Sequence, residues 1–120
     1  MKHEIVEKQG ASIVVFKGEI DLDSSPAARK TLLKCFDKTG NIIVDLSGVT
    51  YIDSSGVASL VEALQAAKKN GSLLSLAAVS EPTRRVLELA RLDKVFRIYG
   101  SVDEALADKA QAPGLRKQHE

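Results

Sequence analysis

The chain has 120 residues, of which 44% are hydrophobic and 28% charged, the composition expected of one soluble globular domain. The formal net charge of +1 and an aromatic content of only 4% argue against a nucleic-acid-binding surface. One cysteine excludes an internal disulfide framework and a cysteine-rich zinc site. No apolar run approaches the roughly 18 residues of a membrane span, and no signal-peptide core is present, so we expect a cytoplasmic location without membrane insertion.

The N-terminal third predicts a β-hairpin followed by a helix. The β-branched runs Ile5-Val6 and Ile13–Phe16 are separated by Gln9-Gly10, a dipeptide typical of a hairpin turn. Ser25, followed by proline, is a favourable helix start, and Gly40 is expected to end that helix. The apolar face of this predicted helix consists of Ala28, Leu32, Cys35 and Phe36.

The remainder alternates between apolar runs of strand length and segments with helical periodicity. The predicted strands are Ile42–Leu46, Leu73–Ala77 and Val95–Ile98. The order is therefore ββαβαβαβα, an α/β fold with about four helices, in which an antiparallel hairpin opens an otherwise parallel sheet. From Gln111 the composition becomes polar, so we expect a domain over residues 1–110 and a disordered tail over 111–120.

Candidates for catalysis are few. His3 and His119 lie near the two ends of the chain, where neither is easily held as a base or a ligand. Cys35 falls on the apolar face of the first predicted helix and is interpreted as a core residue. The sequence has no glycine-rich phosphate-binding loop and no Gly-x-Ser-x-Gly elbow. We therefore expect no catalytic residue, no metal and no cofactor.

The most concentrated signal is the segment Val49–Gly56, between a strand predicted to end near Leu46 and a helix predicted to begin near Ser54. One interpretation is structural: Asp53 or Ser54 accepts hydrogen bonds from the first-turn N–H groups, and the glycine only lets the backbone turn. The other is functional, because a hydroxyl at a helix N-terminus is well placed to carry a phosphate. Both can hold together.

A second acidic spot, Asp21-Leu22-Asp23, follows the second predicted strand. Helix capping and loop solvation are one interpretation of these carboxylates. An Asp-x-Asp pair also resembles haloacid-dehalogenase phosphatases, but those enzymes need a longer chain, a lysine and further acids for magnesium. Together with Asp53 the pair resembles a response-regulator receiver, which begins with a single strand and a helix instead of a hairpin.

Four segments together resemble the STAS domain of bacterial anti-sigma factor antagonists. They are Gly18–Asp21, Ile43–Ser47, Tyr51–Gly56 and Leu89–Phe96, and the similarity covers nearly all of residues 1–108 in the same element order. The motif Asp-Ser-Ser-Gly alone is weak evidence for this resemblance, whereas the four segments together are specific to the family.

The resemblance implies a partner-switching module and not an enzyme. In the family, the serine directly after the aspartate is phosphorylated by an anti-sigma factor that is itself a serine kinase, and a PP2C-type phosphatase removes the phosphate. That serine is Ser54 here, with Ser55 as a second candidate. The chain is expected to be a monomer when free. The expected partner-binding surface comprises Asp21, Asp23, Asp53, Ser54, Ser55 and Gly56.

One departure from the family pattern keeps an alternative open. Antagonists often continue as Gly-Leu-Gly after the serines, and here the residues are Gly56-Val57-Ala58. This variation, with Ser59–Leu64 following, is also similar to small cytoplasmic STAS subunits of lipid-transport ABC systems. Such a subunit would dock on a permease and its ATPase without phosphorylation. A domain within a stressosome-like assembly is a third possibility.

Overall fold

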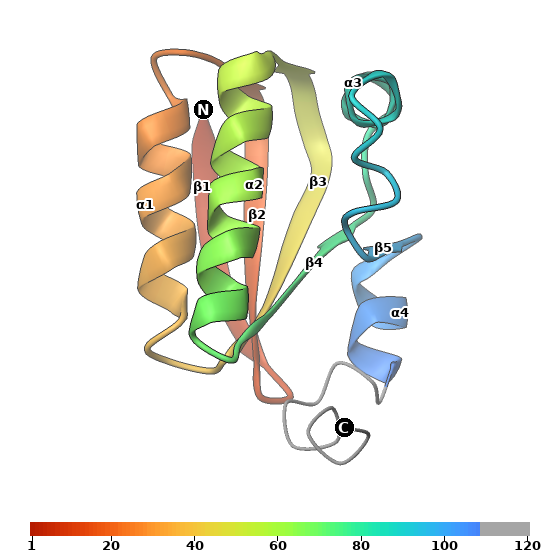
Figure 1. Cartoon of the computed structure of the whole chain (residues 1–120). Coiled ribbons are helices and arrows are strands. Elements are labelled where there is room, and N and C mark those ends of the chain that lie inside the picture. The colour runs from red at the N-terminus through yellow and green to blue at the C-terminus, as the bar shows by residue number, and fades with distance from the viewer. Residues whose placement is uncertain (109–120) are drawn as a thin grey trace.

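The computed structural model describes residues 1–108 and confirms the predicted order of elements (Figure 1). The strands are β1 Lys2–Lys8, β2 Ala11–Ile20, β3 Asn41–Ile52, β4 Leu73–Ala77 and β5 Ile98–Tyr99. The helices are α1 Ser25–Cys35, α2 Ser54–Lys69, α3 Glu81–Leu89 and α4 Val102–Ala107. The tail predicted for residues 111–120 and the domain boundary at residue 110 lie outside the described residues.

The sheet is mixed, as predicted, with strand order β1-β2-β3-β4-β5. β1 and β2 pair antiparallel, and every other neighbouring pair is parallel. The hairpin closes with Lys8 opposite Ala11, so its loop is the two residues Gln9 and Gly10. Both have positive φ, 52° and 77°, the geometry that a two-residue hairpin turn demands. The expected turn is therefore confirmed.

β3 does not end near Leu46 as predicted but continues to Ile52. Its later buried residues, Leu46, Val49 and Ile52, are spaced by three, which is not the alternation of a regular strand. The pairing of β2 with β3 contains two register shifts in this region, and these bulges alter which side chains face inward. The irregular spacing is why the sequence predicted a loop here.

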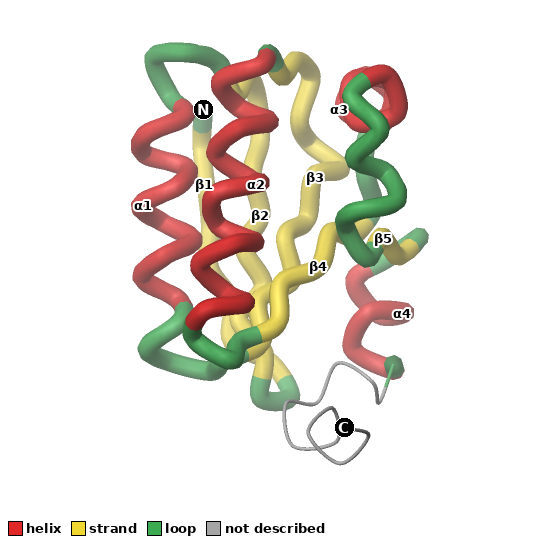
Figure 2. The backbone as a smooth tube through the Cα atoms, in the orientation of Figure 1, coloured by secondary structure: helices red, strands yellow, loops and turns green. Residues whose placement is uncertain are grey.

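α1 and α2 lie side by side on one face of the sheet (Figure 2), and the main core lies beneath them. An ion pair between Arg29 and Glu62, 2.7 Å between the charged atoms, joins the two helices at the surface. A smaller cluster on the other face includes Ile43 and Ala105, which brings α4 onto that side. Ser101 is the N-cap of α4, and its hydroxyl accepts from the Glu104 N–H at 3.1 Å.

The predicted end of the first helix and the predicted range of the last strand are both wrong. α1 stops at Cys35 instead of running to Gly40, because the chain leaves the helix in a turn in which the Phe36 N–H donates to Leu33. The final strand was expected over Val95–Ile98, but β5 is Ile98–Tyr99. The Phe96 N–H donates to Leu92 in a turn, so Phe96 enters the core from a loop.

The single cysteine is a core residue, as expected. Cys35 is buried, and its thiol donates to the carbonyl oxygen of Thr31 at 3.4 Å. Burial raises the pKa of the thiol, so it stays protonated near neutral pH. Over residues 1–108 no cluster of three or more His, Cys, Asp or Glu side chains is arranged to hold a metal ion. In the same part of the chain, no helix combines the length and apolar character needed to span a membrane.

Candidate functional site

The predicted site residues gather where β2 and β3 end. Ile20 and Ile52 are paired across these parallel strands, and the Asp53 N–H donates to the Ile20 carbonyl oxygen at 3.3 Å. Asp21 directly follows β2 and Asp53 directly follows β3. The two acidic segments therefore lie next to each other at the same edge of the sheet. Carboxyl ends of parallel strands followed by helix N-termini are the usual location of functional groups in such sheets.

α2 begins directly after Asp53, which is its N-cap. The Asp53 carboxylate accepts from the Gly56 N–H at 3.0 Å, so the aspartate, not the serine, caps the helix. Ser54 is therefore left as the exposed first residue of α2. Within residues 1–108 no side-chain hydrogen bond holds the Ser54 hydroxyl. This hydroxyl is open to another protein at the positive end of the helix.

Gly56 has a different role from the turn that the sequence suggested. It is buried and does not have a positive φ. A Cβ built on it would lie 2.5 Å from the Ile20 carbonyl oxygen and 2.6 Å from Cγ1 of Ile52. Glycine is thus required because the first turn of α2 touches the ends of β2 and β3. That contact fixes where Ser54 lies relative to the Asp21 loop.

Asp21 organises the loop between β2 and α1. Its Oδ1 accepts from the N–H groups of Asp23 and Ser24, both at 3.1 Å. The Ser24 hydroxyl in turn accepts from the Asp21 N–H at 2.9 Å. Hydrogen bonds from the Ser24 backbone and then from its hydroxyl lower the pKa of the Asp21 carboxyl, so it is ionised at neutral pH. The Asp21 carboxylate thus stabilises the loop and does not cap α1, because the N–H groups that it accepts from precede the helix, while Asp23 stays exposed.

Two serines that the sequence analysis did not single out hold this site together. Ser24, not Ser25, precedes α1 as its N-cap residue. Ser59, buried in α2, has its hydroxyl 3.0 Å from the Ser25 carbonyl oxygen and 3.1 Å from that of Ser55. This bridge ties the start of α1 to the first turn of α2. A small polar residue on an apolar helix face gives no sequence signal for such a role.

The surface around the site is acidic with two exposed apolar side chains. Glu19, Asp21 and Asp23 are among the residues lining a shallow hollow of about 470 Å³ beside the end of β3. Leu22 is 71% exposed and lies between Asp21 and Asp23 in the chain. Tyr51 is 49% exposed and lies two residues before Asp53. Exposed apolar side chains among charges are typical of a protein-binding surface.

Comparison with known proteins gives consistent results. The model of the STAS domain family matches residues 2–105. The anti-sigma-B factor antagonist of Bacillus subtilis is 31% identical over 81 residues, covering 68% of this chain and 74% of that protein. The anti-sigma-F factor antagonist RsfB of Mycobacterium tuberculosis is 28% identical over 105 residues, covering 85% and 84%.

A solved structure has the same fold. The crystal structure of an anti-sigma factor antagonist from Mycobacterium paratuberculosis superposes with a TM-score of 0.79 at 29% identity, covering 88% of this chain and 90% of that one. The structural similarity therefore extends over most of the chain.

Proposed function

Since the chain belongs to the STAS domain family, we propose that it is an anti-sigma factor antagonist controlled by phosphorylation of Ser54. The single observation that carries this proposal is the exposed Ser54 hydroxyl at the first position of α2, beside a capping aspartate. The chain would act in the cytoplasm by binding and not by catalysis. ATP would come with the anti-sigma factor kinase, and a PP2C-type phosphatase would reverse the modification.

The charges around Ser54 support the proposed switch. Phosphate at Ser54 adds a charge of about −1.5 to −2. The helix N-terminus favours this anion by about 0.3–1 kcal/mol, so the fold can tolerate it. Asp53 and the neighbouring Asp21 loop place further negative charge nearby. A partner whose surface fits the neutral hydroxyl would then have to bury a strongly acidic patch. This weakens binding unless the partner has a cation that pairs with the negative charge.

The proposed partner-binding surface combines acids with small and apolar side chains. It contains the expected residues Asp21, Asp23, Asp53, Ser54, Ser55 and Gly56, to which Leu22 and Tyr51 add apolar contact area. Of these, Gly56 is buried and contributes by positioning the first turn of α2, while Ser54 and Asp23 are exposed. A full population switch needs differential binding of about 5.5 kcal/mol, and a smaller difference gives graded control.

The test is to incubate the chain with the anti-sigma factor kinase and ATP, and to map phosphate by mass spectrometry. We expect modification of wild type and Ser55→Ala at Ser54, and none of Ser54→Ala. Ser54→Ala should keep binding the anti-sigma factor after this treatment, whereas Ser54→Asp should bind it more weakly. Equal affinities of wild type, Ser54→Ala and Ser54→Asp would falsify the switch.

A second measurement separates this proposal from the alternative docking role. The tagged chain is purified from cells and its partners are identified. Co-purification of a serine kinase of the anti-sigma type supports the proposal. Co-purification of a permease with its ATPase, in amounts unchanged by Ser54→Asp, would instead assign the chain to a lipid-transport ABC system.

A further inference from the structure

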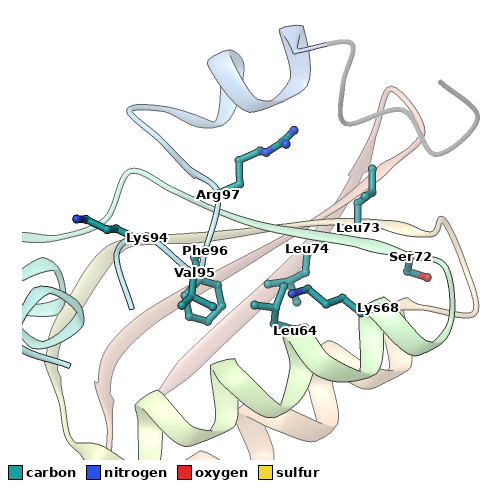
Figure 3. A pocket seen from close by; sticks show the side chains of 9 residues that line it. All are labelled: Leu64, Lys68, Ser72, Leu73, Leu74, Lys94, Val95, Phe96 and Arg97. Carbon is teal, nitrogen blue, oxygen red and sulfur yellow. The ribbon is translucent and has the colours of Figure 1, made fainter. Parts of the chain in front are cut away.

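A pocket lies at the opposite end of α2 from Ser54. It has a volume of about 350 Å³ and lies between the last turn of α2, the start of β4 and the segment before β5 (Figure 3). Pockets that bind small molecules usually measure about 300–1,000 Å³, so this one suits a short ligand. Ser54 begins α2 and Lys68 lies near its end, so this pocket is separate from the phosphorylation site proposed above.

The inner wall of the pocket is apolar. Leu64 from α2, Leu74 from β4 and Phe96 from the loop before β5 are buried, and they lie close together with Val95 in Figure 3. Val95 is 49% exposed, so the pocket opens to solvent over an apolar side chain. An apolar group entering here would cover Val95 and the exposed edges of this wall, which favours binding by removing apolar surface from water.

The polar rim of the pocket is cationic. Lys68, Lys94 and Arg97 line it, and no aspartate or glutamate among residues 1–108 does. Figure 3 shows the Lys68 amine beside the apolar side chains, while Lys94 and Arg97 extend outward from the segment before β5. Within residues 1–108 none of these three cations has a carboxylate within 4.0 Å. In Figure 3 the Arg97 side chain extends to the other side of β4 from α2, and the Lys94 side chain extends away from the pocket, so Lys68 is the cation that lies at the apolar wall.

The end of α2 does not cancel this charge. A helix C-terminus repels anions through its unpaired carbonyl groups. Here three of the last-turn carbonyls, those of Ala66, Ala67 and Lys68, accept from the N–H groups of Asn70, Ser72 and Gly71 respectively. The Lys68 amine therefore determines the charge that an incoming ligand meets at the apolar wall.

From this combination we propose that the pocket binds a short amphiphilic anion. Its carboxylate or phosphate head lies at Lys68, and its apolar body covers Val95 and Phe96. Lys94 and Arg97 contribute long-range attraction at the rim and not the main contact. The ligand is a small molecule, because the pocket has a volume of only about 350 Å³ and is lined by three different segments.

The proposal is tested on the full chain by titration followed with ¹H–¹⁵N correlation spectra. The probes are hexyl phosphate and hexanoate, with hexanol and inorganic phosphate as controls that carry only one half of the ligand. We expect saturable shifts at residues 72–74 and 94–97 with at least one of the two amphiphiles, and binding at least about tenfold weaker for both controls. Whichever amphiphile binds more tightly identifies the head group.

Matched variants assign the contacts. Lys68→Gln should weaken binding of the better amphiphile by about five- to tenfold, since it removes a charge-assisted hydrogen bond. Lys69→Gln, on the same helical turn but not lining the pocket, should leave it unchanged. At the mouth, Val95→Asp should abolish binding by placing a negative charge there, whereas Val95→Thr should preserve most of it.

Three results overturn the proposal. These are the absence of saturable shifts with both amphiphiles, binding of hexanol or inorganic phosphate as tight as that of the amphiphiles, and equal weakening by Lys68→Gln and Lys69→Gln. The proposed switch is tested separately, because Ser54→Ala and Ser54→Asp should both bind the amphiphile like wild type.

Discussion

Replacing Gly56 by alanine tests whether close contact between α2 and the sheet positions the candidate site. The added Cβ would lie 2.5 Å from a backbone oxygen of Ile20 and 2.6 Å from a side-chain carbon of Ile52. No side-chain rotation removes the clash with the backbone, so the first turn of α2 must move outward. Such overpacking costs about 1–3 kcal/mol, against which alanine gains up to about 1 kcal/mol in helix propensity.

The two effects oppose each other, and the geometry decides the sign. Both contacts are well below 3.0 Å, so we expect Gly56→Ala to lower the free energy of unfolding by a net of about 1–2 kcal/mol. With an m-value of about 1–2 kcal/mol/M, the urea midpoint should fall by roughly 1 M. Circular dichroism during urea unfolding measures this shift.

Ala58→Gly is the matched control for this experiment. Ala58 is exposed on α2, so its change to glycine reports helix propensity without a change in packing, at a cost of up to about 1 kcal/mol. If Gly56→Ala proves as stable as wild type or more stable, propensity outweighs the contact and the reasoning about the start of α2 is refuted. If it is less stable, correlation spectra should also show displaced signals at residues 20–24 and 52–55, which Ala58→Gly should not.

Three further changes have defined outcomes. Asp53→Ala should lower stability by about 1 kcal/mol through loss of the α2 cap, and Asp53→Asn should retain most of it; equal losses in urea unfolding would exclude a capping role. The carboxyl of Asp21 should titrate below its ordinary pKa of 3.8 in ¹³C spectra, because its ionised form accepts the Ser24 hydrogen bonds. Its contribution to stability should be present above the unfolded-state pKa and lost as pH falls through the folded one, and Asp21→Asn should remove that dependence. Leu32→Ala, in the core beneath α1, should cost about 2–5 kcal/mol, whereas Leu89→Ala, at a side chain 86% exposed, should change the thermal midpoint little.

Much of the fold followed from the sequence because its signals are local. The Gln9-Gly10 turn, the apolar run Ile42–Leu46 and the helical spacing after Ser54 each specify an element from a few neighbouring residues, and the structure contains each of them. The order of these elements then restricts the sheet to a hairpin followed by parallel strands, since each helical connection returns the chain in the same direction.

The boundaries that failed depend on contacts between distant residues. β3 continues past Leu46 because β2 pairs with it as far as Ile52 through two bulges. The sequence of β3 alone does not reveal which strand pairs with it or in which register. Phe96 has the β propensity of a strand residue, yet it reaches the core from a turn closed by Leu92. Tertiary packing overrides propensity in both cases.

In the candidate site too, the sequence predicts the local features but not the contacts between distant residues. A sequence can indicate that Asp53 and Ser54 begin a helix, since capping is decided within one turn. It cannot show that Gly56 contacts Ile20, which depends on the packing of α2 against β2, or that Ser59 bridges to Ser25, which depends on the packing of α2 against α1. These long-range contacts fix the Asp21 loop beside the exposed serine. Under the proposed function, a phosphate on Ser54 would therefore add its charge to a surface that already carries the Asp21 and Asp53 carboxylates.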